Sequence, residues 1–68
     1  MSSTATYTVT GMTCEHCAAS VTEEISEIAG VEGVDVVVET GAVTVTSAAP
    51  LDASAVRAAV EEAGYQVA

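Results

Sequence analysis

Hydrophobic and polar residues alternate in short stretches of the chain, which is the pattern of half-buried β-strands. The alternation runs through residues 5–10 and again through residues 42–46, and it predicts a strand in each. A β-branched run predicts another strand over residues 34–39. Within it, the three valines 36–38 blur the alternation, so we expect part of this strand to be covered on both faces. Residues 65–68 leave room for one short last strand.

Two further segments carry hydrophobic residues at helical spacing. Thr13 is predicted to cap the first helix, whose apolar positions are Cys17, Val21, Ile25 and Ile28. Gly30 is its stop signal, and Val31 is placed to fold back onto Ile25. Asp52 is predicted to cap the second helix, and Gly64 to end it. Its buried stripe consists of Val56 and Val60 with Ala59 and Ala63, and Leu51 and Val56 have the spacing of a hydrophobic staple.

The order of these elements is β-α-β-β-α-β, which predicts a ferredoxin-like α+β fold. Two helices would cover one face of a four-stranded antiparallel sheet, with a tight turn at Thr40-Gly41 inside the best hairpin of the sequence. Residues 1–68 are predicted to form a single domain. The polar residues 1–4 are predicted to be disordered.

The amino-acid composition restricts the possible functions of the chain more than it restricts the possible folds. Of the 34 hydrophobic residues 25 are Ala or Val, so the core has few large side chains and no room for a catalytic cavity. A net charge of −9 argues against nucleic acid and against anionic membrane surfaces, because both attract Lys and Arg. No apolar run is long enough for membrane insertion, and no secretion signal is visible. We therefore expect a cytoplasmic protein that is not an enzyme and whose charged partners present basic surfaces.

The segment that carries chemistry is Gly11-Met12-Thr13-Cys14-Glu15-His16-Cys17. Two cysteines three apart at a helix start lie on one face, about 5–6 Å apart at their Cβ atoms, so both sulfurs can meet on one ion. The positive end of the helix dipole favours the thiolate over the thiol. A closed zinc site wants four ligands, whereas soft Cu(I) prefers thiolates and needs only two. A two-sulfur site open on one side would let an incoming thiolate take the ion away.

These residues resemble the Gly-Met-x-Cys-x-x-Cys signature of the heavy-metal-associated domain family. The resemblance extends over nearly the whole chain, through the element order, the stretch 33–37 and the late Gly64-Tyr65. It is strongest to small bacterial copper chaperones that deliver Cu(I) to copper-transporting P-type ATPases. It implies that Cys14 and Cys17 are the copper ligands, and that Met12 is a core residue supporting the loop.

The resemblance also implies that Tyr65 is the aromatic residue beside the site in bacterial members, where many eukaryotic members have Lys. The simpler alternative is a helix-end contact of Tyr65 with Val60. Because this chain has no Lys, two thiolates and one Cu(I) would leave a negative charge without a compensating cation. For His16 three roles stay open: tuning the proton affinity of the thiols, an exposed bystander, or direct ligation across a dimer.

The leading hypothesis from the sequence is a Cu(I) metallochaperone that hands its ion to an ATPase, through the metal-binding domains of the ATPase or a basic docking surface. Exposed thiolates could also link two chains into a copper-bridged homodimer. The alternatives are a detached N-terminal domain of such an ATPase, a mercury carrier, or a zinc carrier with Glu15 as third ligand. A thiol–disulfide oxidoreductase is the alternative from a different class. The lone proline, Pro50, lies in a polar loop and argues against it, because oxidoreductases of the thioredoxin kind pair their motif with a cis-proline segment.

Overall fold

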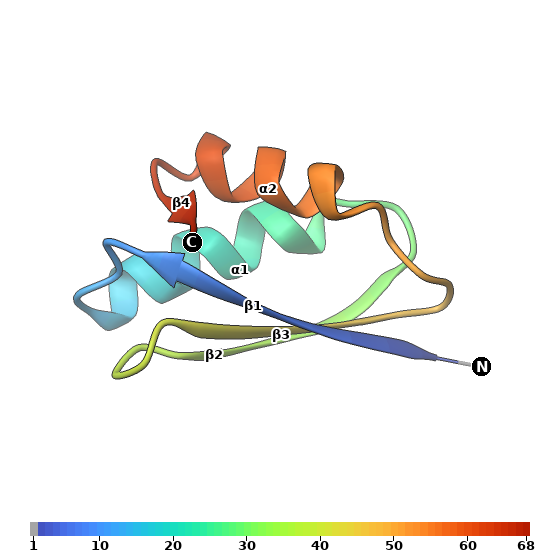
Figure 1. Ribbon diagram of the computed structural model, residues 1–68, viewed down its shortest axis with the longest axis horizontal. Helices are drawn as coiled ribbons and strands as arrows, with labels where there is room; N and C mark the ends of the chain where they lie inside the picture. Colours follow the sequence, from blue (N-terminus) through green and yellow to red (C-terminus); the bar gives the residue numbers. More distant parts are fainter. Residues whose placement is uncertain (1) are drawn as a thin grey trace.

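The structure is a computed structural model that describes residues 2–68, and its elements follow the expected order (Figure 1). They are β1 (Ser3–Thr10), α1 (Glu15–Ser26), β2 (Val31–Val37), β3 (Ala42–Ser47), α2 (Ala53–Glu62) and β4 (Gln66–Val67). The strands form one sheet in the order β2-β3-β1-β4, and every neighbouring pair is antiparallel. The fold is therefore the ferredoxin-like α+β fold that the sequence predicts.

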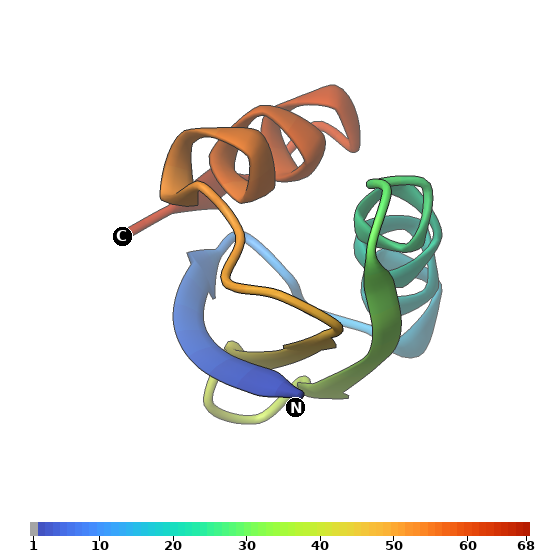
Figure 2. The ribbon, with the colours of Figure 1, turned by 90° about the vertical axis from the view of Figure 1, so that its right-hand side faces the viewer.

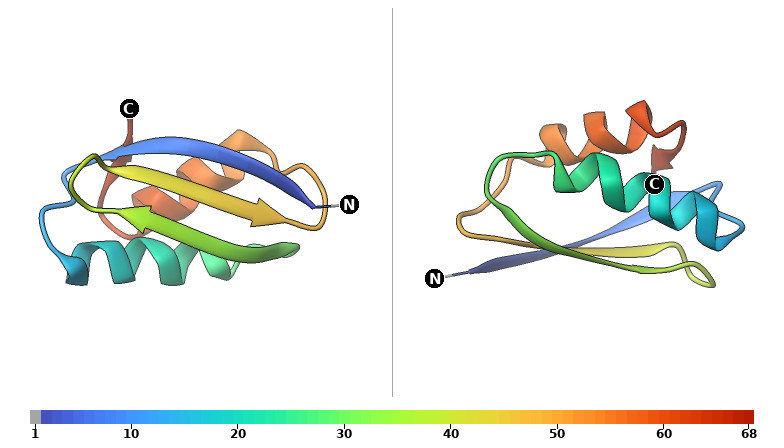
Figure 3. Two further views of the ribbon diagram at one scale, coloured as in Figure 1. Left: turned by 90° about the horizontal axis from the view of Figure 1, so that it is seen from below. Right: turned by 180° about the vertical axis from the view of Figure 1, so that it is seen from behind.

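Both helices lie on the same face of the sheet, and the opposite face is open to solvent (Figures 2 and 3). The layers meet in a core of small and medium-sized side chains, the largest of which is the fully buried Ile25. The other buried hydrophobic residues are Val9, Met12, Val21, Val43, Val45, Val56, Ala59 and Val60. Along β3 the buried side chains alternate without interruption with more exposed ones, as the period of two requires.

Two sequence expectations at the strand starts need correction. The first strand begins at Ser3 rather than at residue 5, because β3 is long enough to pair Ser3 with Ser47 and Thr4 with Thr46. The expected disorder of residues 1–4 therefore fails at Ser3 and Thr4, and Met1 lies outside the described residues. The second predicted strand, β2, starts at Val31 rather than at residue 34, because a register irregularity between Val31 and Gly33 lets it continue pairing with β3.

Two strand ends also differ from the predictions. The structure ends β2 at Val37, and Val37 is 47% exposed, so the expectation of cover on both faces is wrong there. Val37 lies opposite Ala42 at the end of β2, where its side chain faces the solvent. The last strand consists only of Gln66 and Val67, which pair with Thr10 and Val9 of β1.

The turn between β2 and β3 is anchored to the strand that leads into the cysteine loop. Gly41 has φ +76°, and its carbonyl accepts a hydrogen bond of 2.8 Å from the Val9 amide. A Cβ atom at position 41 would lie 2.5 Å from the Val9 carbonyl oxygen, so only glycine fits. This contact holds the end of β1 in place just before the loop.

The second helix begins as predicted. The Asp52 side chain accepts hydrogen bonds from the Ser54 amide, at 3.0 Å, and from the Ser54 hydroxyl, at 2.8 Å. These bonds lower the pKa of the Asp52 carboxyl, with the amide as the larger cause. The helix ends at Glu62 with Ala63 as its C-cap, and the following Gly64, with a φ of +94°, turns the chain back toward β4. This turn places Tyr65 at the same end of the molecule as the cysteine loop.

Candidate metal site

The loop between β1 and α1 is tied to the protein at both of its ends. Gly11 has φ +88°, a conformation that residues with a Cβ atom rarely adopt, and it lets the chain turn after β1. Met12 follows with 7% exposure and belongs to the hydrophobic core. Because the thioether is buried, Met12 supports the loop from below while Cys14 faces the solvent.

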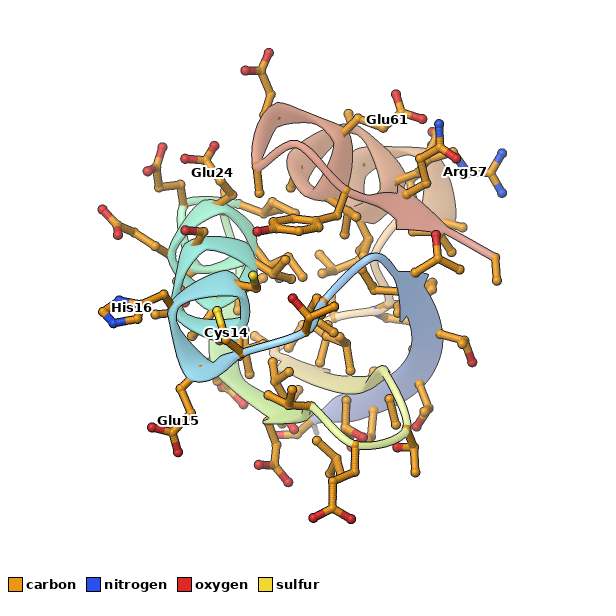
Figure 4. All side chains as sticks on the ribbon, turned by 90° about the vertical axis from the view of Figure 1, so that its left-hand side faces the viewer. Cys14, Glu15, His16, Glu24, Arg57 and Glu61 are labelled. Carbon is orange, nitrogen blue, oxygen red and sulfur yellow. The ribbon has the colours of Figure 1, made fainter. Side chains whose placement is uncertain are left out.

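The two cysteine sulfurs lie close together at the start of α1 (Figure 4). The distance between Cys14 Sγ and Cys17 Sγ is 3.3 Å, and both thiols are free. Cys14 is exposed, whereas Cys17 is half-buried and packs against the core. The pair therefore presents one sulfur to solvent and one that the fold holds in place.

Cys14, not Thr13, is the N-cap of α1, which corrects the sequence prediction. Its backbone is extended, with φ −154° and ψ 170°, and its side chain makes no capping hydrogen bond. The Cys14 carbonyl accepts bonds from the amides of Cys17, at 3.1 Å, and of Ala18, at 3.2 Å. Thr13 acts through its backbone amide instead, which donates a hydrogen bond to the Cys17 sulfur. This donor has no signature in the side-chain pattern, so the sequence could not reveal it.

Tyr65 reaches the site from the opposite end of the chain. Its ring lies over Gly11, where a Cβ atom would come 3.4 Å from Tyr65 Cδ1. Its hydroxyl donates a hydrogen bond to the Cys17 sulfur, and this bond is the largest cause that lowers the pKa of the Cys17 thiol from 9.0 to about 6. Backbone donation from Thr13 and the Cys14 side chain add to the shift, while burial opposes it. The same bond raises the pKa of Tyr65, so the tyrosine stays protonated as the donor.

Replacing Tyr65 by phenylalanine is expected to raise the pKa of Cys17 from about 6 toward 9.0, because the ring stays and the donated proton is lost. A depressed thiol pKa favours the folded state fully above pH 9.0, and this contribution disappears as the pH falls through about 6. The pH profile of iodoacetamide labelling measures the change. Cleavage after Glu15 separates the two cysteines, so the Cys14 peptide is the internal control. A Cys17 profile that stays at its original midpoint would contradict the role of the hydroxyl.

The other polar residues of the motif point away from the sulfurs. Figure 4 shows the side chains of Glu15 and His16 directed outward from α1 rather than toward Cys14, and both are exposed. Within residues 2–68 no group of three or more His, Cys, Asp and Glu side chains is placed to hold a metal ion. The loop thus offers a pair of sulfurs, and the role of His16 stays a prediction.

Acidic side chains are distributed along both helices. Glu15 projects from the start of α1, Glu24 from the far half of the same helix and Glu61 from α2, whereas Arg57 is the only Lys or Arg residue in the whole sequence (Figure 4). None of the helices in residues 2–68 has the length and apolar character needed to cross a lipid bilayer. The protein that carries the dithiol is therefore strongly negative as a whole, with ten Asp and Glu residues against a single Arg.

The fold and the site together define a class of small ferredoxin-like domain with a dithiol at the start of its first helix. The chain matches the model of the heavy-metal-associated domain over residues 6–66, and it belongs to this family. It is 38% identical over 64 residues to the copper chaperone CopZ of Bacillus subtilis strain 168, an alignment that covers 93% of both chains.

Solved structures give the same family and the same fold. A structure titled CopZ metallochaperone superposes with a TM-score of 0.90 at 34% identity, covering 97% of this chain and 100% of the other. Oxidised MerP from Ralstonia metallidurans CH34 gives 0.87 at 36% identity, covering 100% and 96%. A copper-binding domain from the P-type ATPase HMA7 gives 0.88 at 26% identity, covering 100% and 92%.

Proposed function

We propose that this protein is a Cu(I) metallochaperone that carries copper on Cys14 and Cys17 and passes it on by ligand exchange. The observation that carries the proposal is the pair of free sulfurs, 3.3 Å apart, with one exposed and the other held at a depressed pKa of about 6. A thiolate, not a thiol, is the metal ligand, so Cys17 is ready to bind at neutral pH. The likeness to a copper chaperone and to the CopZ metallochaperone supports copper as the cargo.

The donor set favours a soft monovalent ion. Two thiolates suit Cu(I), whereas structural zinc sites take four ligands and Glu15 and His16 point away from the pair. If metal–sulfur bonds are roughly 2.3 Å long, as in zinc thiolates, a linear arrangement separates the sulfurs by up to ~4.6 Å. The pair must then open by about 1 Å from its 3.3 Å separation, and the exposed Cys14 side chain, which makes no capping bond, is free to move outward.

The proposed receiver is a copper-transporting P-type ATPase, and its incoming thiolate reaches the ion from the Cys14 side. The structural likeness to an ATPase copper-binding domain supports such a partner, and it equally suits the alternative that this chain is a domain of such an ATPase. We place the protein in the cytoplasm, where thiols are kept reduced, and regard it as a carrier rather than an enzyme. A copper-bridged homodimer stays open in this proposal.

Transfer to the ATPase domain is expected to slow as salt rises, because the net charge of −9 would steer the protein toward a basic partner surface. Between about 0.01 M and about 1 M salt the screening length falls from roughly 30 Å to roughly 3 Å, and we expect roughly a tenfold or larger loss of rate. Stopped-flow measurement of the transfer checks this. The control is copper removal by an uncharged thiol such as 2-mercaptoethanol, and the rate of this reaction should be nearly independent of salt. Equal salt dependence of the two reactions would eliminate electrostatic steering.

The experiment that tests the function is native mass spectrometry under anaerobic conditions during stepwise addition of Cu(I), with Zn(II) present in excess. The expected result is selective loading with Cu(I), followed by its appearance on an added copper ATPase domain. Preferential loading with zinc would overturn the copper assignment. Rapid reduction of insulin by the same sample would instead revive the oxidoreductase alternative.

A further inference from the structure

The outer edge of β1 is unpaired over much of its length. Within residues 2–68, β1 pairs with β3 on one side, and on the other side the short β4 pairs only with Val9 and Thr10. The chain then ends at Ala68, whose amide donates a hydrogen bond of 2.7 Å to the Thr8 carbonyl. Residues 3–7 remain, and we call them the free edge of β1. Figure 3 shows this part of the strand at the margin of the sheet.

The unpaired backbone groups of the free edge belong to Thr4 and Thr6. In an antiparallel sheet, successive residues of a strand direct their N–H and C=O groups to opposite sides. The Thr8 carbonyl points to the β4 side, where it accepts the bond from Ala68. Thr6 and Thr4 lie two and four positions earlier and therefore point to the same side, beyond the reach of β4. Such a row of donors and acceptors is a template for another strand.

The opposite edge of the sheet, β2, is protected against pairing with another strand. It carries the exposed carboxylates Glu32 and Asp35 and a register irregularity next to Gly33. Charges and irregularities of this kind are how natural sheets block their edges. The free edge of β1 has neither, because it reads Ser-Thr-Ala-Thr-Tyr and contains no charged residue in a chain of net charge −9.

A second copy of the chain fits the free edge because this edge is complementary to itself. When two copies run antiparallel about a two-fold axis at Ala5, Thr4 of each copy lies opposite Thr6 of the other. These residues then exchange N–H···O=C hydrogen bonds, and threonine pairs across strands are favourable. The exposed Ala5 meets its own counterpart at the axis, where the small side chain allows the close approach of a non-hydrogen-bonded pair.

The ends of the strand and the charge of the chain support this arrangement. Ala68 lies beside Thr8, so a register shifted toward β4 would bring the second strand against it. Two copies of net charge −9 repel one another, so a contact between them has to avoid carboxylates. The free edge of β1 meets this condition, whereas pairing through β2 would bring Glu32 and Asp35 of both copies together.

We propose that the protein forms a two-fold dimer through the free edge of β1, which joins the two four-stranded sheets into one continuous sheet. The cysteine loop follows the other end of β1, so the two antiparallel strands place the two loops at opposite ends of the dimer. Both dithiols stay accessible, and the contact requires no metal. The paired edge is short, so the dimer belongs with the small, transient interfaces. The proposal is independent of the proposed copper function.

The first test uses the metal-free, reduced protein in about 0.15 M salt, where the repulsion between charges is screened beyond roughly 8 Å. Sedimentation equilibrium should show a monomer that converts to a dimer as the concentration approaches the millimolar range. Over the same range, NMR should show slower hydrogen exchange at the amides of Thr4 and Thr6. The Ala5 amide, which points to β3, is the internal control. A monomer throughout, or a dimer that forms only after Cu(I) is added, would overturn the proposal.

The second test exploits the position of Ala5 on the two-fold axis. Ala5→Glu and Ala5→Lys each place like charges opposite one another, and each should weaken the dimer by roughly tenfold or more. An equimolar mixture of the two variants places opposite charges there, and it should form a heterodimer more readily than either variant associates alone.

Ser26→Glu and Ser26→Lys are the matched controls for added charge, because Ser26 is exposed at the end of α1, the helix that packs over β2. Neither substitution, nor their mixture, should change the dimer by as much as the Ala5 variants do. Circular dichroism establishes that every variant is folded. Ala5 variants that associate like the wild type, or a mixture that associates no better than its components, would place the contact elsewhere and overturn the proposal.

Discussion

Serine at position 14 or 17 is expected to weaken Cu(I) binding by far more than the roughly 10–100-fold that loss of a group merely supporting a metal ligand costs. Each substitution removes one of two thiolates, and a hydroxyl is a hard, protonated donor that soft Cu(I) does not select. The measurement is anaerobic competition with a Cu(I)-specific chelator.

The matched control is Ser26→Ala, which changes an exposed residue in the last turn of α1, far along the helix from the loop. It should leave the affinity unchanged. Unaltered affinity in both cysteine variants would show that copper is bound elsewhere or not at all. Circular dichroism of each variant confirms that the fold is retained during the comparison.

Ile25→Ala is expected to destabilise the protein by about 2–5 kcal/mol, because it removes the largest fully buried side chain and leaves a cavity between α1 and the sheet. A chain of this length has a total stability of roughly 3–10 kcal/mol, so much of it would be lost. The buried core consists mainly of valine, whose short side chains cannot extend into the space. Urea unfolding of the metal-free protein should show a lower midpoint with an unchanged slope.

Ser26→Ala again provides the comparison, since an exposed substitution away from special features usually changes stability by no more than about 0.5 kcal/mol. A loss below about 1 kcal/mol in Ile25→Ala would mean that the core contracts around the missing atoms. In that case Ile25 would not be the principal anchor of the helix layer.

The fold was predictable because local signals agreed with one another. Alternation predicted β1 and β3, a β-branched run predicted β2, and Asp52 predicted the start of the second helix through a side-chain cap that the structure contains. What failed depended on long-range pairing. The early starts of β1 and β2 follow from the length of β3 and from the irregularity near Gly33, and neither is visible in a single segment.

For the candidate site, the sequence predicted the two cysteines as a pair but not the tertiary contacts around them. The spacing of Cys14 and Cys17 at a helix start is a local property, and the structure brings their sulfurs together. The hydrogen bond of Tyr65 depends on how the turn at Gly64 is placed against the loop at Gly11, which is a tertiary property. The resemblance to a family suggested that Tyr65 lies near the site, but not that its hydroxyl donates to Cys17.

Tyr65, the donor of this hydrogen bond, follows its acceptor Cys17 by 48 residues in a chain of 68. A polypeptide emerging from the ribosome has made both cysteines long before it makes Tyr65, and until the last turn folds, Cys17 lacks its principal donor. The depressed pKa of the Cys17 thiol therefore arises only once the chain has folded through Tyr65.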